Sequence, residues 1–305
     1  MKMNNIPICK IPDALWTIEK LDIIEAECKF GLPFHVKIGN GIYRIQSLRI
    51  LRLRRAKIYA VPRLPESLII LELHALYMTF PDLSNLTNLK ELDMRFWPCH
   101  DDVKSNGHVE DPMPQWIGKL RKLESLKLYS IYVTTLTTDI SLLPQLKALE
   151  LGCSNLRCLP SLPSSLSSLY LYKCKSLCSM DLSNLKKLSY LNILKSPISE
   201  IRGLDCLENL QILSICKLRQ MEILPHLSKT KKLRDLTVKF CSILVEIQGE
   251  LPQSLEILRI YSCESLQKLP DLSSLKGLQR VKIEDCMKLN VDAILAFARR
   301  SRANF

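Results

Sequence analysis

The densest group of side chains capable of chemistry lies in one polar stretch of the sequence. It holds one thiol, two imidazoles and three carboxylates, the donor types of zinc sites and of acid–base pairs. These are Cys99, His100, Asp101, Asp102, His108 and Asp111. Two observations argue against a metal site: the group is not supported by a second pair of ligands at helical or strand spacing, and polar loops are ordinarily solvated. We therefore interpret residues 98–115 as an inserted loop that a partner could touch, and we predict no metal and no cofactor.

Five of the twelve cysteines share one position, because each precedes a leucine by three residues. Such regularity indicates a structural role, since a small buried thiol with a weak S–H donor suits a turn whose backbone carbonyls need partners. No C-x-x-C pair supports a zinc site. The five residues are Cys153, Cys174, Cys241, Cys263 and Cys286.

Motifs that place catalytic groups are missing from the sequence. The one Gly-Lys pair, Gly118-Lys119, lacks the upstream glycine and the following Ser or Thr of a phosphate-binding loop. Gly39 and Gly41 form a G-x-G without a third glycine, and neither G-x-S-x-G nor H-E-x-x-H occurs. We predict that the chain is not an enzyme and that it has no small-molecule substrate.

The elements that position these residues follow from a strong internal period. A frame L-x-x-L-x-L, with Ile, Val or Met allowed, recurs at spacings of 20 to 23 residues, apart from one spacing of 34 that holds the insertion. A period of 20 to 29 residues is typical of leucine-rich repeats. The frames begin at Leu48, Leu68, Leu89, Leu123, Leu146, Leu166, Leu188, Leu210, Leu233, Leu255 and Leu278.

Within each frame the alternation of apolar and polar residues predicts a short strand. In residues 257–261, Leu258 and Ile260 should point inward and their neighbours outward. A single repeat cannot bury its apolar face alone, so neighbouring repeats must stack. We predict an α/β repeat solenoid: a leucine-rich-repeat horseshoe with one long parallel β-sheet on the concave side and irregular or short-helical returns on the convex side.

The period also divides the chain. Residues 1–47 are expected to form a degenerate N-terminal repeat or cap, and residues 48–289 an array of about eleven repeats. Residues 290–305 carry apolar side chains at helical spacing, which favours a short amphipathic helix that caps the last repeat.

Partner recognition is expected on the outward strand positions, because the inward ones are committed to the core. Tyrosines are enriched at interface hot spots, and Tyr170, Tyr172 and Tyr190 fall on two adjacent repeats. The alternative for these three is mutual packing along the sheet without a partner. The candidate partner-binding residues are Tyr129, Tyr170, Tyr172, Tyr190, Leu194, Arg259 and Tyr261.

The chain has a formal net charge of +12, but its basic runs lie in separate repeats. Nucleic acid is therefore not the favoured partner, and an anionic membrane surface or an acidic protein domain fits better. The first residues lack the apolar run of a secretory signal, and no run of 18 apolar residues occurs. We expect a cytoplasmic protein with reduced thiols.

Three repeats carry a more specific pattern, an L-P-x-S-L opening followed in two of them by C-x-S-L. They read LPQSLEILRIYSCESLQKLPDLSSLKGL, LPSSLSSLYLYKCKSLCSMDLSNLKKL and LPESLIILELHALYMTFPDLSNLTNL. Over residues 18–289 the chain resembles the TIR-type-like leucine-rich-repeat region of plant intracellular nucleotide-binding disease-resistance proteins. The resemblance implies a cytosolic role in sensing pathogen effectors or in contacting host domains of a receptor.

The sequence departs from that family in one respect. The N-terminal signalling domain and the nucleotide-binding domain of such receptors do not appear in the 305 residues. We expect a recognition module without signalling activity of its own. The alternative is a stand-alone repeat scaffold or substrate receptor in ubiquitin-ligase or small-GTPase signalling.

Overall fold

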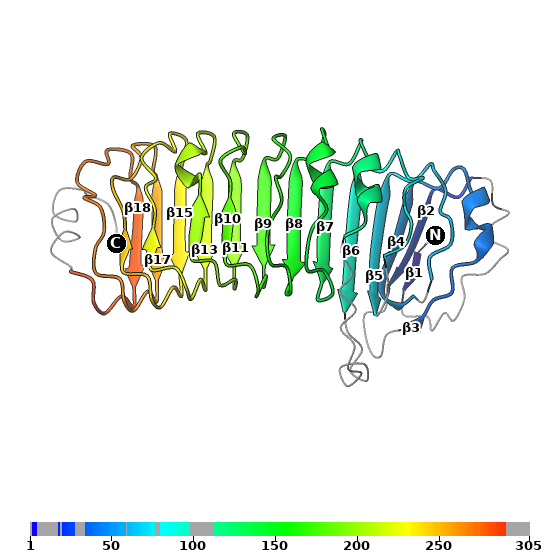
Figure 1. The fold of residues 1–305 in the computed structure, drawn as a ribbon, viewed down its shortest axis with the longest axis horizontal. Helices are drawn as coiled ribbons and strands as arrows, with labels where there is room; N and C mark the ends of the chain where they lie inside the picture. Colours follow the sequence, from blue (N-terminus) through cyan, green and yellow to red (C-terminus); the bar gives the residue numbers. More distant parts are fainter. Residues whose placement is uncertain are drawn as a thin grey trace. The chain divides into compact units, whose positions relative to one another are not determined.

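A computed structural model of the chain shows two compact units, Met1–Ser154 and Asn155–Phe305. Both are built from short parallel strands that lie side by side (Figure 1). The structure describes residues 2–4, 18, 20–27, 34–58, 60–76, 80–97 and 113–290.

The strands of the first unit all pair in parallel, in the order β1-β2-β4-β5-β6-β7-β8, and β3 pairs with β4. Short 3₁₀ turns lie between some of them. The elements are β1 (Lys2–Asn4), β2 (Ile23–Glu27), β3 (Phe34–His35), η2 (Asn40–Arg44), β4 (Ile50–Lys57), β5 (Ile70–Leu76), β6 (Glu91–Trp97), η4 (Gln115–Lys119), β7 (Ser125–Ser130), η5 (Thr138–Leu142) and β8 (Ala148–Cys153).

The second unit repeats this plan with a main parallel sheet in the order β9-β11-β13-β15-β17-β18. Two small parallel sheets, β10-β12 and β14-β16, lie in its return segments. The elements are β9 (Ser168–Tyr172), β10 (Ser179–Asp181), β11 (Tyr190–Leu194), β12 (Glu200–Arg202), η6 (Leu204–Cys206), β13 (Ile212–Cys216), β14 (Ile223–Leu224), β15 (Asp235–Lys239), β16 (Glu246–Ile247), β17 (Ile257–Tyr261) and β18 (Arg280–Glu284).

The leucine frame accounts for where the strands begin. In each predicted repeat a strand starts two residues after the first leucine of the frame, as at Ile50 after Leu48 and Ile257 after Leu255. Leu258 and Ile260 are fully buried, and their three neighbours on β17 are half-buried. The predicted inward and outward frame is confirmed, and with it the parallel-sheet repeat solenoid.

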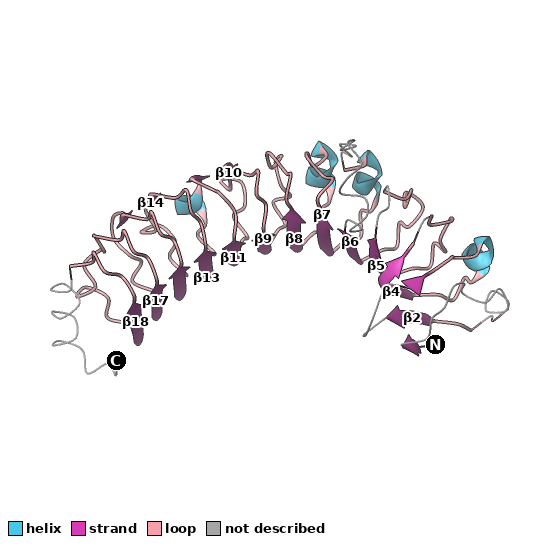
Figure 2. Ribbon diagram, turned by 90° about the horizontal axis from the view of Figure 1, so that it is seen from below, coloured by secondary structure: helices cyan, strands magenta, loops and turns pink. Residues whose placement is uncertain are grey.

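The return segments lie opposite the sheet in each unit and contain little helix (Figure 2). Within the described residues the helices are 3₁₀ turns of three to five residues, and none is long and apolar enough to cross a membrane. Side chains in these segments reach back to a backbone carbonyl of the preceding repeat. Examples are the amide of Asn184 to Leu162 at 2.8 Å and the hydroxyl of Ser67 to Leu48 at 2.8 Å.

The cysteine position has the predicted structural character. Cys153, Cys174, Cys241 and Cys263 are buried, and Cys286 is half-buried. Four of these thiols donate to a backbone carbonyl at the strand end, for example from Cys263 to Tyr261 at 3.5 Å, and the Cys153 thiol donates to Leu128 of the preceding repeat. A weak donor thus partners carbonyls where the chain leaves the sheet.

Several predictions fall on residues that the structure does not describe. The candidate metal cluster from Cys99 to Asp111 lies outside the described residues, and so does most of the insertion 98–115. The proposed C-terminal helix, within 290–305, is described only at residue 290.

Candidate binding face

The outward side chains of the first unit form a row of ion pairs that crosses from strand to strand. On β4, the Arg52 guanidinium lies 2.6 Å from Glu25 and 2.8 Å from Glu72. Arg54 reaches the second carboxylate oxygen of Glu72 at 2.6 Å. Glu72 is thus held by two guanidinium groups on the neighbouring strand, a charge-assisted arrangement that fixes the row.

Asp93 continues this row on β6. Its carboxylate lies 2.9 Å from Arg95 and 3.4 Å from Nε2 of His74. Burial alone would raise the pKa of Asp93, but the His74 and Arg95 side chains outweigh burial and lower it from 3.8 to about 2. The sheet face of the first unit therefore carries carboxylates that are already paired.

Tyr129, one of the predicted binding residues, belongs to the same row. It stands at an outward position of β7, yet only 8% of it is exposed. Its neighbour in register is Gly152, where any β-carbon would overlap the tyrosine ring, so the ring lies flat over that strand. The Arg95 guanidinium lies 4.5 Å from the ring centre, and the hydroxyl donates to Glu150. Tyr129 thus presents little surface to a partner.

The second unit brings four of the predicted residues together. Tyr170 and Tyr172 on β9 stack with ring centres 6.3 Å apart and planes 9° apart. Leu194 on β11 lies opposite Tyr172, and the Tyr190 hydroxyl accepts a hydrogen bond from Asn192, which lies opposite Tyr170. All four residues are half-buried, so part of each side chain faces solvent.

Comparison with solved structures agrees with this architecture. A leucine-rich-repeat protein of Leptospira interrogans is similar over 97% of this chain and 75% of its own, with 20% sequence identity and a TM-score of 0.66. The fold is that of a leucine-rich-repeat protein. The leucine-rich-repeat domain of the type III effector XopL has 24% identity over 68% of this chain and 69% of its own, with a TM-score of 0.49.

Another similar structure is the functional domain of InlJ from Listeria monocytogenes, with 17% identity over 83% of this chain and 62% of its own, and a TM-score of 0.46. No protein-family model matches the sequence. The search of curated proteins likewise gave no match.

Two exposed apolar residues on or beside the main sheet of the second unit were not among the predicted binding residues. Ile212 on β13 lies in register beside Tyr190 and is 38% exposed. Phe240 follows β15 and is 46% exposed, with the Lys217 amine 5.2 Å from its ring centre. Ile212 occupies the same outward strand position in its repeat as Tyr190 does in the repeat before. The sequence could have identified it from that shared position. We call Tyr170, Tyr172, Tyr190, Leu194 and Ile212 the tyrosine cluster.

The two remaining predicted residues lie apart from the tyrosine cluster. Arg259 and Tyr261 are on β17, three strands from β11, which corresponds to roughly 14 Å. Arg259 makes an ion pair of 2.7 Å with Asp235. The Tyr261 ring is contacted by the amines of Lys239 and Lys282, at 4.7 and 5.4 Å. Both side chains therefore already have partners within the repeat array.

Proposed function

We propose that this chain is a protein-binding module and that the tyrosine cluster is its contact surface. The supporting observation is the collection of three tyrosines, a leucine and an isoleucine on three adjacent strands, all partly exposed. Rigid aromatic side chains offer a large contact area at low entropic cost, which is why they dominate interface hot spots. A contiguous exposed apolar patch on a soluble domain ordinarily marks an interaction site.

The resemblance of the repeats to plant disease-resistance receptors supports a more specific role. In that role the cluster would contact a pathogen effector or a host domain of the same receptor in the cytoplasm. The L-P-x-S-L and C-x-S-L patterns carry this part of the proposal.

The test is a triple variant, Tyr170→Ala, Tyr172→Ala and Tyr190→Ala. Against a partner isolated by crosslinking from plant extract and then purified, binding should weaken by more than about 2 kcal/mol, or roughly thirtyfold in Kd. Isothermal titration calorimetry measures the affinity, and a melting curve checks that the variant is folded.

A control removes three apolar side chains that are more exposed and lie in return segments: Tyr43→Ala, Leu142→Ala and Ile223→Ala. The control should bind like the original chain. Equal affinity of the tyrosine variant and the original chain would refute the contact surface, and the three tyrosines would then serve packing along the sheet alone.

A further inference from the structure

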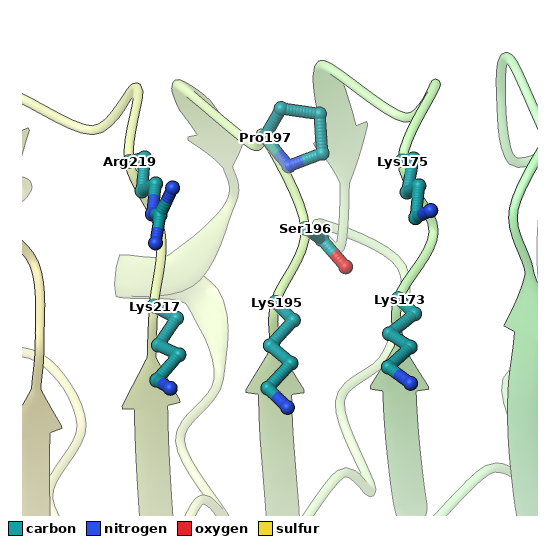
Figure 3. Close-up of a pocket in the computed structure, with 7 residues that line it drawn as sticks. All are labelled: Lys173, Lys175, Lys195, Ser196, Pro197, Lys217 and Arg219. Atoms are coloured by element: carbon teal, nitrogen blue, oxygen red, sulfur yellow. The ribbon is translucent and has the colours of Figure 1, made fainter.

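Three lysines stand in a row at the carboxyl ends of adjacent strands in the second unit. Lys173, Lys195 and Lys217 follow β9, β11 and β13 at a constant spacing of 22 residues (Figure 3). Their backbones are held in the left-handed region, with φ of 53°, 57° and 59°. Each backbone N–H donates to a carbonyl of the next repeat at 2.8 to 2.9 Å, which fixes where each side chain starts.

The backbone conformation is common to the repeats, but the lysines are not. The next three repeats place Phe240, Ser262 and Asp285 at the same position with the same positive φ. Within the second unit the row of positive charge is therefore confined to three successive repeats, and the first unit has Arg55 at the same position with φ of 56°. Adjacent members start about 4.8 Å apart, the spacing of neighbouring strands.

A second row, two residues further along each repeat, shapes a hollow above the first. It contains Lys175, Pro197 and Arg219, so two long basic side chains flank a short ring, with the small Ser196 beneath (Figure 3). The hollow has a volume of about 370 Å³. We call it the lysine cup; its lining residues are Lys173, Lys175, Lys195, Ser196, Pro197, Lys217 and Arg219.

The five cations of the lysine cup are not neutralised by the part of the chain that the structure describes. None of them makes an ion pair with a described carboxylate, whereas Arg52 and Arg54 in the first unit each make two. Lys173 and Lys217 contact aromatic rings, at 4.9 Å from Tyr172 and 5.2 Å from Phe240, which leaves their charge uncompensated. Five uncompensated charges around one hollow create a strong local attraction for anions.

We propose that the lysine cup binds a compact soluble ligand that carries two or more phosphate groups. A phosphate monoester carries roughly −1.5 to −2 charges near neutral pH, so about three such groups would balance five cations. The flanking side chains and the central Pro197 line one open hollow of about 370 Å³, which suits a small ligand. This site shares no residue with the tyrosine cluster, although the Lys173 amine contacts the Tyr172 ring, and the proposal does not depend on the proposed protein contact.

An acidic peptide fits this arrangement less well. Side chains on one face of an extended peptide recur about every 6.6 to 7 Å, whereas neighbouring lysines of the row start about 4.8 Å apart. Linked phosphates place their charges closer together than peptide carboxylates do. The density of cations in a hollow of about 370 Å³ therefore favours the phosphate compound.

Titration calorimetry of the full chain with inorganic tripolyphosphate tests the proposal. Changing Lys173, Lys195 and Lys217 to glutamine retains most of the side-chain length and removes three charges, so affinity should fall by roughly tenfold or more. The matched control changes Lys187, Lys231 and Lys276, which are exposed in return segments, to glutamine. The control should keep the original affinity, and an equal loss in both variants would overturn the site in favour of diffuse charge attraction.

Pro197→Lys separates a shaped site from a charged patch. The equivalent positions hold Lys175 and Arg219, so the backbone accommodates a long side chain there. Filling the hollow should weaken tripolyphosphate binding by roughly fivefold although a positive charge is added. Tighter binding by this variant would overturn the proposal.

Three further probes complete the test. Orthophosphate should bind more weakly than tripolyphosphate, because it uses fewer of the cations. A polyglutamate peptide, or vesicles of anionic phospholipid, that bind at the lysine cup when tripolyphosphate does not would also overturn it.

Discussion

The sheet faces of the two units are made by the same outward positions of the same repeat, yet they are chemically different. In the first unit the outward row runs through paired charges, Arg52 with Glu72 and Asp93 with Arg95. In the second unit the equivalent positions begin with Tyr170 and Asn192, and free lysine charge gathers at the strand ends. The difference shows that the repeat pattern specifies the backbone. The outward residues determine whether the side chains of a face pair with one another or remain available to a ligand.

Partly buried pairs explain why the first face is the less available one. Glu72 is 16% exposed and is contacted by two guanidinium groups, so a ligand that displaced either contact would leave a charge without its partner. Binding to the aromatic side chains of the second face breaks no ion pair. A partner there only covers surface that is already apolar.

The largest expected effect comes from the inward frame that both faces share. Leu258→Asp places an unpaired carboxylate in the core of the second unit and should lower the free energy of unfolding by more than about 4 kcal/mol. Calorimetric melting measures the loss. Ser214→Asp, at a half-buried outward position, is the control and should melt almost like the original chain. An unchanged melting temperature for Leu258→Asp would mean that the inward and outward assignment is wrong.

A smaller effect is expected from the ion-pair row of the first unit. Glu72→Gln removes the charge held by Arg52 and Arg54 and should cost about 2 kcal/mol in urea unfolding, less at high salt. The control, Glu66→Gln, breaks an exposed pair with Arg63 and should cost less than about 0.5 kcal/mol. If both variants lowered the free energy of unfolding equally, the ion pairs of this sheet face would be no different from those of an ordinary charged surface.

The third effect, similar in size to that of Glu72→Gln, concerns acid. Because the folded pKa of Asp93 is about 2, below its ordinary 3.8, this residue contributes stability that is present above pH 3.8 and is lost as pH falls through about 2. The contribution should be roughly 2 kcal/mol. Urea unfolding at a series of pH values measures it, and Asp93→Asn should remove this part of the acid dependence. A variant with the same pH dependence as the original chain would contradict the assignment to Asp93.

The sequence predicted the strands and the core well because both follow from spacing alone. The frame leucines and the cysteine column recur at fixed intervals, and stacking of repeats turns each interval into one place in the core. The candidate site was predicted in part. Tyr170, Tyr172 and Tyr190 lie together because adjacent repeats keep the same register.

Burial of Tyr129 could not be read from its position. It depends on a neighbour 23 residues away, Gly152, that lets the ring lie over the backbone, and on a guanidinium from β6. The lysine cup shows the same limitation. The 22-residue spacing of its lysines is visible in the sequence. The direction of each lysine side chain, however, follows from a left-handed backbone conformation, which a lysine residue does not predict.

The side chains that reach back to the preceding repeat give the array a polarity. Asn184 and Ser67 are donors, and the carbonyls that receive them belong to the repeat before. Removal of the repeat before would therefore strand these side-chain donors, whereas removal of the repeat after would strand backbone donors such as Lys173, whose N–H reaches Leu194. Shortening the array at one end would therefore leave unpaired side-chain donors, and shortening it at the other would leave unpaired backbone donors.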